Sequence, residues 1–570
     1  MQKRWTLLPE ADQALVTQLN EELNMPPVLA QLLVQRGITS FDEARRFFLP
    51  DESLFHPPFL MKDMDRAVSR IRQAIADGEK ILIYGDYDVD GTTAVTLVYS
   101  YLKKFHPHIA YYIPDRYKEG YGISFAGIDY AEANGYTLMI ALDCGIKSVD
   151  KAKYAGEKGI DMIIGDHHLP GDELPDAVAV LDPKRSDCPY PYKELSGCGI
   201  GFKLCEAFAE DQGFPAEEVY ALLDLCAISI ASDIVPITGE NRAMAALGLK
   251  KLNADPSVGL KALMEVSGKT EGYTISDVVF MLGPRINAAG RMGDAKHAVK
   301  LLLAEEKLSA DEQGALINLK NAERKEYDKQ ITAQALAQID GNEMLMKSKT
   351  TVVFQPDWHK GVIGIVASRL TEKYYRPTIV LTQSNGHVAG SARSVAGFDL
   401  YEALCGCSDL LIQFGGHKFA AGLTMEPENV PAFQQKFEEV VSASISDELL
   451  IQQIKIDGEI SLCDIDARFF RILCRFAPFG PGNMSPVFLS RNVQVAGIPQ
   501  LLKEAHLKFF AGEKGSAMFE CIAFGMGEQF ALLQSGKPLD ICYCIEEKVW
   551  KENRTLQLMI KGIRPAEEAA

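Results

Sequence analysis

Three features of the sequence predict an α/β protein with two α/β lobes joined by a long helix and followed by a small β-structure. Short apolar runs alternate with helical stretches between residues 80 and 182 and again between 350 and 446, as in parallel sheets covered by helices on both faces. Between these blocks, residues 307–340 are strongly charged but carry apolar side chains four residues apart, as along one side of a helix. After Leu450, short strands separated by glycine and proline indicate a small barrel or sandwich.

The size and composition are those of an ordinary globular protein. At roughly 150 residues per domain, 570 residues correspond to about four units. The 47% hydrophobic and 24% charged residues exclude a disordered, collagen-like or coiled-coil chain. The longest apolar runs are far shorter than the roughly 20 residues of a membrane span, and the N-terminus lacks the apolar segment of a signal peptide. We therefore expect a cytoplasmic protein with no membrane partner.

The charge and the cysteines do not indicate a function by themselves. With 59 Lys and Arg against 77 Asp and Glu, the net charge is −18, whereas nucleic-acid-binding proteins usually show a basic footprint. Because total charge says nothing about local patches, any binding of nucleic acid must be argued from a site. The 12 cysteines include no C-x-x-C pair and no zinc-finger spacing. We expect most of them to be small buried side chains in a reducing compartment.

The elements of the first block follow from local periodicity. Residues 1–75 are helical in pattern and are broken at Pro26–Pro27 and Pro57–Pro58. Residues 91–102 are expected to form a helix because their apolar side chains recur three or four apart, and residues 200–305 are mostly helical in pattern. The apolar runs predicted as strands are Ile81–Tyr84, Ile109–Ile113, Leu138–Leu142, Met162–Ile164 and Ala177–Leu181, with further helices at 124–134 and 149–158.

The second block is predicted from fewer signals. Two strands, at 351–354 and 378–381, flank a helix at 362–374. The helix at 307–340 is expected to connect two lobes, and its alternative is a plain surface helix of one domain. Beyond the second block, the expected strands are Gln453–Asp457, Val493–Ala496, Ala517–Phe524 and Leu539–Tyr543.

Acidic residues and histidines follow the predicted strands of the first block. Ligands of open α/β sheets bind outside the carboxyl ends of the strands. Several carboxylates that converge there would repel one another unless cations were present. Carboxylate and imidazole ligands suit Mn²⁺ or Mg²⁺, with Zn²⁺ as a further candidate, and more than four ligands indicate two metal ions. These residues are Asp86, Asp88 and Asp90 in GDYDVDG, Asp143 in LDCG, Asp166, His167 and His168 in GDHH, and Asp233 in ASDIVP.

A separate structural role for each motif explains the sequence less well than one metal site shared by all of them. D-x-D-x-D-G begins like a calcium loop, but the twelfth position counted from Asp86 is Leu97, where such a loop needs a closing Glu. A single Asp at a strand end caps the following helix more often than it binds metal, and a single His-His pair is usually structural. Acidic or histidine motifs at three strand ends of one block together favour a metal site.

These motifs resemble those of the DHH phosphoesterase superfamily. GDYDVDGTTA, ALDCGIKS, IIGDHHLP and ASDIVPITGENR resemble its metal-site motifs, in this order. GPRINAAGRM, WHKGVIGIVASRL, SARS and FGGHKFAAG, together with the N-terminal PPVLAQLLVQRGITSFDEA, resemble the RecJ branch over residues 20–565. The helical pattern of residues 1–75 predicts a small N-terminal cap. The resemblance implies a DHH domain at 76–305, a connecting helix at 306–342, a DHHA1 domain at 343–448 and an OB-fold-like barrel that binds nucleic acid at 449–570.

The resemblance also implies roles for the acidic and histidine residues. Asp143 is expected to bridge two metal ions, Mn²⁺ or Mg²⁺. Asp90, His167 and Asp233 resemble the other ligands of one ion, and Asp88 with Asp86 those of the second. Related pyrophosphatases carry a histidine where this chain has Tyr84, so the weight on Asp86 stays open. His168 is expected to face the scissile phosphate, and Asp166 to orient a histidine.

The second lobe is expected to hold the end of the substrate. Arg393 and Ser391 in SARS are similar to residues that hold a terminal 5′-phosphate, and the guanidinium fork binds phosphate oxygens bidentately; the alternative for each arginine is a surface ion pair. The FGGHKFAAG glycines, read as a loop, let backbone approach a phosphate closely. Phe509 and Phe510 are either stacking or core residues, with core favoured. The remaining candidates are Arg116, Arg285, Asn287, Gly415, Gly416 and His417.

The function implied by the resemblance is a single-stranded-DNA-specific 5′→3′ exonuclease that releases 5′-mononucleotides in DNA repair and recombination. Its expected partners are single-stranded DNA with a 5′ end, a RecQ-type helicase and a single-strand-binding protein, and we expect a monomer. One alternative is a DHH phosphodiesterase for short oligoribonucleotides or cyclic dinucleotides. Another is a catalytically inactive replication scaffold, which the near-complete set of expected ligands disfavours.

Overall fold

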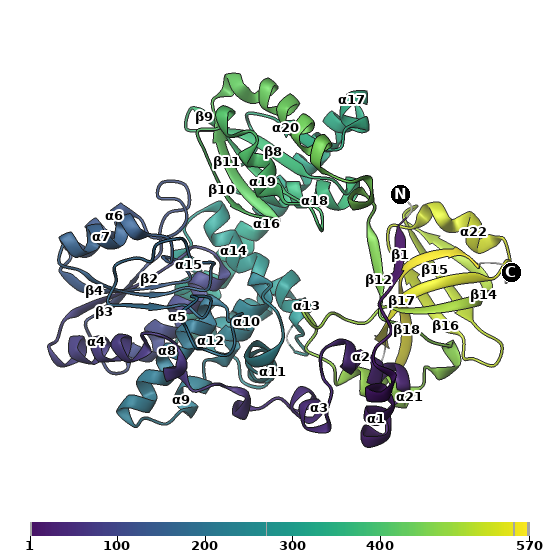
Figure 1. Cartoon of the computed structure of the whole chain (residues 1–570), viewed down its shortest axis with the longest axis horizontal. Helices are drawn as coiled ribbons and strands as arrows, with labels where there is room; N and C mark the ends of the chain where they lie inside the picture. The colour runs from purple at the N-terminus through teal and green to yellow at the C-terminus, as the bar shows by residue number, and fades with distance from the viewer. Residues whose placement is uncertain (1–2, 270, 551–552, 567–570) are drawn as a thin grey trace.

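The computed structural model describes residues 3–269, 271–550 and 553–566, so the last four residues of the predicted C-terminal domain lie outside the described part. Figure 1 shows two α/β lobes and a β-rich unit arranged around a central region. The predicted fold class is confirmed: two α/β lobes are joined by a long helix and followed by a unit of C-terminal strands.

The first lobe is built on a parallel five-stranded sheet whose strand order reverses next to its centre. The strands lie in the order β3-β2-β4-β5-β6, so the chain runs from β2 to the edge strand β3 and then back to β4 on the other side. The carboxyl ends of β2 and β4 therefore flank a switch point, where ligands bind in such sheets. The strands are β2 (Lys80–Gly85), β3 (Ile109–Tyr112), β4 (Tyr136–Leu142), β5 (Asp161–Gly165) and β6 (Ala179–Leu181).

Helices cover both faces of this sheet. Ile83 and Ile140 pack with α5 and α8 in the main core, whereas Leu82 and Met139 pack with α6 and α7 on the opposite face. The almost continuous apolar strands reflect this burial on two sides. The helices are α4 (Met64–Ala76), α5 (Val89–Lys103), α6 (Phe125–Ala133), α7 (Val149–Glu157), α8 (Gly197–Gln212), α9 (Glu217–Tyr220), α10 (Leu223–Asp233), α11 (Gly239–Ala254), α12 (Val258–Ser267), α13 (Ile275–Asp277), the π-helical η3 (Val278–Leu282), α14 (Gly283–Met292) and α15 (Lys296–Leu302).

The helix α16 (Lys307–Asp340) connects the two lobes. Its 34 residues extend for about 50 Å at a rise of 1.5 Å per residue. Ile317, in its first half, belongs to the core of the first lobe, and Ile331 and Ile339, in its second half, belong to a core with α18 of the second lobe. One helix thus fixes the position of one lobe relative to the other.

The second lobe is a mixed five-stranded sheet in the order β10-β11-β9-β8-β7, of which only the β7–β8 pair is parallel. Its α18 packs against α16, while α19 and α20 pack in a separate core. The segment FGGHKFAAG, expected as a loop, is a β-hairpin of β10 and β11. The elements are α17 (Glu343–Lys347), β7 (Thr351–Phe354), α18 (Ile363–Tyr374), β8 (Thr378–Ser384), β9 (His387–Arg393), α19 (Leu400–Cys405), β10 (Gln413–His417), β11 (Ala420–Met425) and α20 (Val430–Ser444).

The C-terminal strands close into a ring. The order β13-β14-β15-β16-β18-β17 is closed by pairing of β14 with β17. Phe509 lies in the core of this ring, as expected, whereas Phe510 is 45% exposed. The elements are β12 (Gln453–Ile456), β13 (Gly458–Glu459), α21 (Ala467–Cys474), β14 (Phe488–Leu502), β15 (His506–Gly512), β16 (Phe519–Ala523), α22 (Phe530–Gln534), β17 (Leu539–Trp550) and β18 (Asn553–Pro565).

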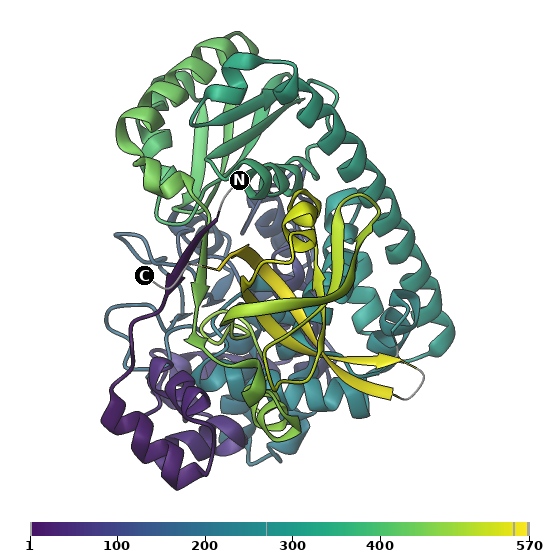
Figure 2. The same ribbon diagram turned by 90° about the vertical axis from the view of Figure 1, so that its right-hand side faces the viewer.

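The structure divides the N-terminal segment that the sequence suggests as one helical cap. Helices α1 (Gln13–Leu23), α2 (Pro27–Gln35) and α3 (Phe41–Phe48) share a core with the C-terminal ring, whereas α4 packs into the first lobe. A strand that was not expected, β1 (Arg4–Leu7), pairs in parallel with β12, and Figure 2 shows it beside the ring. Amphipathic periodicity gives the buried side of a helix but not the surface that covers it.

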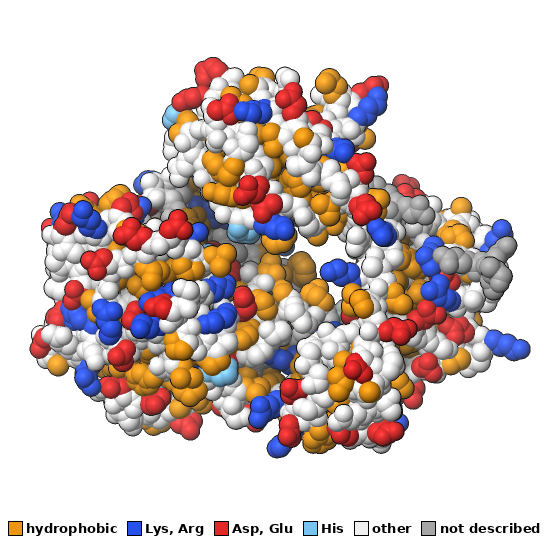
Figure 3. All heavy atoms as spheres, viewed as in Figure 1, with side chains coloured by type: hydrophobic (Ala, Val, Ile, Leu, Met, Phe, Trp, Pro, Cys, Tyr) orange, Lys and Arg blue, Asp and Glu red, His pale blue; other side chains and the backbone are white. Residues whose placement is uncertain are grey.

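The surface carries charges of both signs. Figure 3 shows acidic and basic side chains intermixed over one face, and an opening where the two lobes and the ring meet. In the described part of the chain, no helix is both long and apolar enough to cross a membrane.

Candidate metal centre

The predicted acidic and histidine residues gather at the switch point of the first sheet. Asp86 follows β2, Asp143 follows β4, and the Asp166–His168 motif follows β5. Asp90 lies in the first turn of α5, and Asp233 is the last residue of α10. Parallel strands bring their carboxyl ends to one edge, so residues far apart in sequence meet there.

His167 stands at the centre of three carboxylates. Its Nε2 lies 3.2 Å from Asp143 Oδ1, 3.5 Å from Asp233 Oδ2 and 3.6 Å from Asp90 Oδ2. The side chain is 7% exposed, and both ring nitrogens are buried without a hydrogen-bond partner among the described residues. Buried polar atoms are normally paired. These orphaned nitrogens and the carboxylates around them therefore fit the ligand set of a divalent cation.

Asp90 is held rigidly by the N-terminus of α8. Its carboxylate accepts hydrogen bonds from the backbone N–H groups of Gly197 at 2.7 Å and Cys198 at 2.8 Å, and from Ser229 Oγ at 2.7 Å. The N-terminal end of a helix stabilises negative charge. A Cβ on Gly197 would lie 2.6 Å from Asp143 Cβ, so the close approach of α8 to the centre requires glycine at this position.

Asp143 adopts an unusual backbone conformation at the middle of the site. Its φ of 58° lies in the left-handed region, which is costly for a non-glycine residue and often marks a functional position. Its Oδ2 is buried without a hydrogen-bond partner in the described part of the chain, and its backbone oxygen accepts a hydrogen bond from the Tyr121 hydroxyl at 3.2 Å. The free carboxylate oxygen is available to a second cation.

Asp86 and Asp88 belong to neither of the two groups of closely spaced ligand atoms among the described residues, although the sequence predicts both as metal ligands. Asp86 Oδ1 accepts a hydrogen bond from Gly122 N at 3.2 Å, while its Oδ2 is buried without a described partner. Asp88 caps α5 by accepting from Gly91 N at 3.0 Å. Among the described residues, the two groups whose ligand atoms lie within 4.8 Å of one another are Asp90, His167, Asp233 and Asp143, His167, His168.

Tyr84 has a structural environment. It is fully buried, donates a hydrogen bond to the Gly122 carbonyl at 2.9 Å and stacks on Tyr112 with ring centroids 5.4 Å apart. Burial raises its pKa well above the usual range of tyrosine, so it remains a neutral donor. It supports the segment that positions Asp86 and is not placed among the ligand groups.

His168 is fixed by Asp166, in the arrangement that the resemblance implies. Its Nδ1 lies 2.7 Å from Asp166 Oδ1, and its Nε2 lies 3.2 Å from the Tyr121 hydroxyl. Burial alone would lower the pKa of His168, but the Asp166 hydrogen bond raises it to about 9. Burial would raise the pKa of Asp166, but His168 and the backbone N–H of Ile146 lower it to about 2. This pair is therefore ionic near neutral pH.

The remaining carboxyls are electrostatically frustrated. Burial and the neighbouring Asp88 raise the pKa of Asp86 well above the ordinary value. Burial and the surrounding carboxylates do the same to Asp143 and Asp233. Cations bound between these groups would offset both the cost of burying the negative charges and the repulsion between them.

A cationic cavity of about 450 Å³ lies between the two lobes beside this centre. It is lined by Arg116 and Arg291 from the first lobe and by Arg393 from the second. No acidic side chain is among the described residues that line it. Burial and the charges of Arg116 and Arg393 lower the pKa of Arg291 to about 9. Clustered guanidinium groups in a lining without acidic side chains form a site for an anion such as phosphate.

Each of the three arginines is held by a contact. Arg393 donates to Ser391 Oγ at 3.1 Å, Arg116 lies 4.7 Å from the centroid of the Tyr87 ring, and Arg291 donates to the carbonyl oxygen of Gly361 at 3.0 Å. Tyr121 lines the cavity and also contacts His168 in the acidic centre. The anion site and the candidate metal site thus share a wall.

Arg291 was not singled out in the sequence, and Arg285 was singled out instead. Arg285 donates to Asn318 Oδ1 and to the carbonyl oxygens of Met281 and Val266, and it does not line the cavity. Both arginines lie on α14 six residues apart, so they project about 120° apart around the helix. The second arginine of GPRINAAGRM was the available signal, but only the packing of α14 reveals which one faces the second lobe.

Three other predicted substrate residues are not brought to this lining. Gly415 lines the cavity, but Gly416, His417 and Asn287 do not. Gly416 has a φ of 146°, and a Cβ there would lie 2.4 Å from the Ala420 carbonyl oxygen, so this glycine is required by the β10–β11 hairpin. His417 is exposed.

The segment after Asp233 is docked on the C-terminal unit. Ile237 N donates to the Pro481 carbonyl at 2.7 Å. A Cβ on Gly480 would lie 2.4 Å from Ile237 Cδ1, and one on Gly482 would lie 2.8 Å from Thr238 Cγ2. The loop before β14 therefore packs without a gap against the residues that follow a candidate ligand.

Three segments match known families. Residues 80–230 match the DHH family, N-terminal domain, residues 347–443 match the DHHA1 domain, and residues 456–562 match the RecJ OB domain. The chain is 38% identical over 568 residues to the single-stranded-DNA-specific exonuclease RecJ of Bacillus subtilis (strain 168), covering 99% of this chain and 71% of that protein. It is 33% identical over 573 residues to RecJ of Escherichia coli (strain K12), covering 95% and 96% of the two chains.

Solved structures are similar to this fold as a whole. The crystal structure of RecJ in complex with Mn²⁺ from Thermus thermophilus matches with a TM-score of 0.85 at 27% identity, over 99% of this chain and 80% of that chain. A crystal structure of exonuclease RecJ bound to manganese matches with a TM-score of 0.60 at 32% identity, over 69% of this chain and 97% of that chain.

The buried carboxyls predict how stability depends on pH. A carboxyl whose pKa is raised in the folded state contributes stability at low pH that is lost as pH rises through that pKa. In chelator, thermal unfolding should therefore shift to lower temperature as pH rises above the ordinary range of a carboxyl pKa. Asp143→Asn should reduce this shift, and the exposed control Asp172→Asn should not. Saturating Mn²⁺ should stabilise the wild-type protein more than Asp143→Asn. If Asp143→Asn and Asp172→Asn showed the same pH-dependent shift in unfolding temperature, the assignment of Asp143 would be contradicted.

The docking of Gly480 predicts a coupling between the C-terminal unit and the metal site. Gly480→Val should push Ile237 and displace Asp233, weakening Mn²⁺ binding about tenfold in calorimetry, as loss of a supporting group typically does. Ile237→Ala in the same chain should restore part of the affinity by removing the clash. The matched control is Gly156→Ala, which meets open space. An unchanged Mn²⁺ affinity in Gly480→Val would refute the coupling.

Proposed function

The chain belongs to the RecJ family of single-stranded-DNA-specific exonucleases, and on that premise we propose that it removes 5′-mononucleotides from the 5′ end of single-stranded DNA. The observation that carries this proposal is the shared wall of the two sites: Tyr121 lines the arginine cavity and contacts His168 in the acidic centre. We propose that the fixed separation between the anion site and the hydrolytic centre places the first phosphodiester bond at the centre when the terminal phosphate is bound in the cavity.

The arginine cavity is proposed to hold the terminal 5′-phosphate. Arg116, Arg291 and Arg393 converge there, and Arg393 is oriented by its hydrogen bond to Ser391. Gly364, in the first turn of α18, lines the same cavity. Helix N-termini bind phosphate through free N–H groups and the helix dipole. The cavity lies between two lobes that α16 holds together, so we propose that it accepts a single strand and not a duplex.

The acidic centre is proposed to hold two divalent ions, Mn²⁺ or Mg²⁺. Asp90, His167 and Asp233 would hold one, Asp86 and Asp88 the other, and Asp143 both. When bound, such ions supply a hydroxide nucleophile near neutral pH and neutralise charge on the reacting phosphate. The chain contributes the rigid placement of these ligands, through the α8 N-terminus at Asp90.

His168 is proposed to stabilise negative charge on the scissile phosphate. Its Nδ1–H donates to Asp166, which leaves the Nε2 side facing Tyr121 and the cavity. Because the pKa of His168 is raised to about 9, its Nε2 carries a proton near pH 7 and can donate to a phosphate oxygen. Asp166 acts through His168 by fixing the ring and its charge.

We further propose that the protein acts on DNA in the cytoplasm, during repair and recombination, as a monomer. A RecQ-type helicase and a single-strand-binding protein are its proposed partners, since an enzyme that requires single strands depends on strand separation. The twelve free cysteines fit a reducing compartment.

The polarity is tested with single-stranded DNA labelled at its 5′ end. In Mn²⁺, the label should leave at once as a mononucleotide, and EDTA or Asp143→Asn should abolish the release. A ladder of shrinking labelled products would instead mean attack from the 3′ end. Release that falls as the strand lengthens would favour a small-substrate phosphodiesterase.

The role of the arginine cavity is tested by two arginines on one helix. Arg291→Gln should raise KM for a 5′-phosphorylated strand about tenfold or more, because a charge-assisted hydrogen bond contributes roughly 1.5–3 kcal/mol. The same variant should have little effect on a strand with a 5′-hydroxyl. Arg285→Gln is the matched control, since that side chain bonds to Asn318 and carbonyl oxygens away from the cavity. Equal effects of the two variants on both ends would refute the assignment.

A further inference from the structure

The turn before α18 brings the second lobe into contact with the first. It carries the residues WHKG (358–361), the start of a motif that resembles the RecJ branch and that has no role in the proposed mechanism. Trp358 packs in the core that α16 shares with α18, and its Nε1 donates to Gln334 Oε1 at 2.7 Å. Lys360 lines the arginine cavity. The turn is thus held in the second lobe and reaches the cavity between the lobes.

Gly361 is the residue of this turn that contacts Arg291. Its carbonyl oxygen accepts a hydrogen bond from Arg291 Nη1 at 3.0 Å. A Cβ on Gly361 would lie 2.5 Å from the Arg291 carbonyl oxygen and 2.5 Å from the Tyr117 hydroxyl, so the turn packs on the end of α14 without room for a side chain. The Tyr117 hydroxyl also donates to the Arg291 carbonyl oxygen. The orientation of Arg291 therefore depends on where the Gly361 carbonyl lies.

His359 fixes the shape of the turn. Its Nδ1 accepts a hydrogen bond from Gly361 N at 3.1 Å, and its backbone oxygen accepts one from Val362 N at 2.9 Å. Its ring lies against Tyr327 of α16, with ring centroids 5.0 Å apart. Because burial lowers the pKa of His359, the ring is neutral near pH 7 and its Nδ1 can accept. The imidazole thus connects the Gly361 peptide to the helix that joins the lobes.

The surroundings of Arg291 explain why its guanidinium needs support. Arg116 and Arg393 line the same cavity, and no acidic side chain is among the described residues of that lining, so the three positive charges repel one another before an anion binds. A bidentate contact with phosphate depends on the orientation of the guanidinium plane. By accepting from Nη1, the Gly361 carbonyl offsets part of the repulsion and fixes that plane.

We propose that His359 is a positioning residue for recognition of the 5′-phosphate and that it acts on Arg291 through the Gly361 carbonyl. His359 does not itself line the arginine cavity. It orients a guanidinium of the first lobe from a turn of the second lobe, so the phosphate site is complete only where the two lobes meet. The inference rests on the proposed function, because the ligand of the cavity is taken to be the terminal phosphate.

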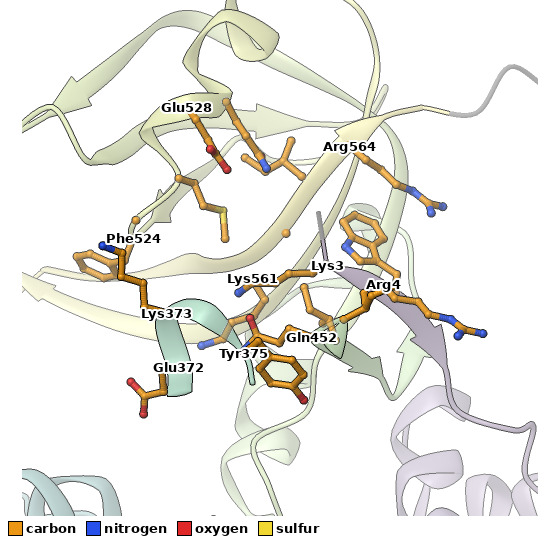
Figure 4. Close-up of a pocket in the computed structure, with 18 residues that line it drawn as sticks. Lys3, Arg4, Glu372, Lys373, Tyr375, Gln452, Phe524, Glu528, Lys561 and Arg564 are labelled. Atoms are coloured by element: carbon orange, nitrogen blue, oxygen red, sulfur yellow. The ribbon is translucent and has the colours of Figure 1, made fainter. Parts of the chain in front are cut away.

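The opposite end of α18 provides an internal control. Figure 4 shows Glu372 and Tyr375 there, beside a cavity that β1 and the C-terminal ring also line. The helix has 12 residues and is about 18 Å long, so this end is well separated from the turn. A change at Glu372 could affect Arg291 only through the whole helix, whereas a change at His359 acts on the turn directly.

The test measures the preference for a phosphorylated end by binding. Fluorescence anisotropy in EDTA compares a short 3′-labelled oligothymidylate that carries a 5′-phosphate with one that carries a 5′-hydroxyl, so cleavage is not needed. His359→Ala should lower the preference of the wild-type protein for the phosphorylated end about fivefold, as expected for loss of one hydrogen bond that orients a charged group. The controls Glu372→Gln and His387→Ala, which removes an exposed histidine of the same lobe, should leave the preference unchanged.

Two further variants separate the acceptor atom from the ring. His359→Asn should restore most of the preference, because an asparagine side chain accepts from the backbone N–H two residues on in the same way. His359→Phe keeps an aromatic ring beside Tyr327 but lacks the acceptor, so it should lose the preference as His359→Ala does.

A double variant gives a readout that a merely structural defect would not produce. Because His359 is proposed to act through Arg291, adding His359→Ala to Arg291→Gln should reduce the preference no further, whereas two independent defects would multiply. In cleavage assays with Mn²⁺, His359→Ala should raise KM for the phosphorylated strand about fivefold and change kcat less than about twofold.

Two results would overturn the inference. One is an unchanged preference in both His359→Ala and His359→Phe, and the other is a loss in the double variant that equals the product of the two single losses. Failure of the proposed function has a different signature. The wild-type protein would then bind the two ends equally and release no 5′-mononucleotide, and the inference would be rejected together with the proposed function.

Discussion

The mutual repulsion of buried carboxylates is the constraint on which the rest of this structure depends. Asp90, Asp143 and Asp233 place oxygens within 3.6 Å of one imidazole nitrogen, and Asp90 and Asp143 are buried away from the water that would screen their charge. Like charges at such distances cannot all be ionised in a protein interior without a counter-charge. Several elements of the fold hold these carboxylates in place despite their repulsion. The N-terminus of α8 binds Asp90, and its close approach to Asp143 requires glycine at position 197. Asp143 itself follows the central strand β4 and adopts a left-handed backbone conformation.

The same constraint explains why the units are tied together around the first lobe. A centre that is unstable without cations is easily deformed, so its ligands need support from outside their own sheet. Asp233 ends α10, and the next residues dock on the loop before β14 without room for a Cβ at Gly480. Arg242, in the following helix, is 3% exposed and donates to the carbonyl oxygens of Phe476 and Pro478. The C-terminal unit is therefore part of the framework of the candidate metal centre.

The sequence was sufficient for features that are local in the chain. Asp86, Asp143 and His167 could be predicted because each follows an apolar run, and parallel strands bring such positions together. The long helix could be predicted from its period alone.

Features decided by packing could not be predicted. Arg285 and Arg291 differ only in the side of α14 on which they lie, and the periodicity gave no reason to prefer either. The pairing of Arg4 with Gln453 joins the N-terminal strand to the start of the C-terminal unit, and no local signal in β1 identifies its partner. The hairpin of FGGHKFAAG has too many glycines for strand propensity to identify it.

The net charge of −18 is compatible with binding a polyanion because the field inside a narrow site is set by the nearest groups. The arginine cavity has no acidic side chain among its described lining residues. An anion between Arg116, Arg291 and Arg393 would therefore meet positive charge at close range, although the exterior of the protein is acidic.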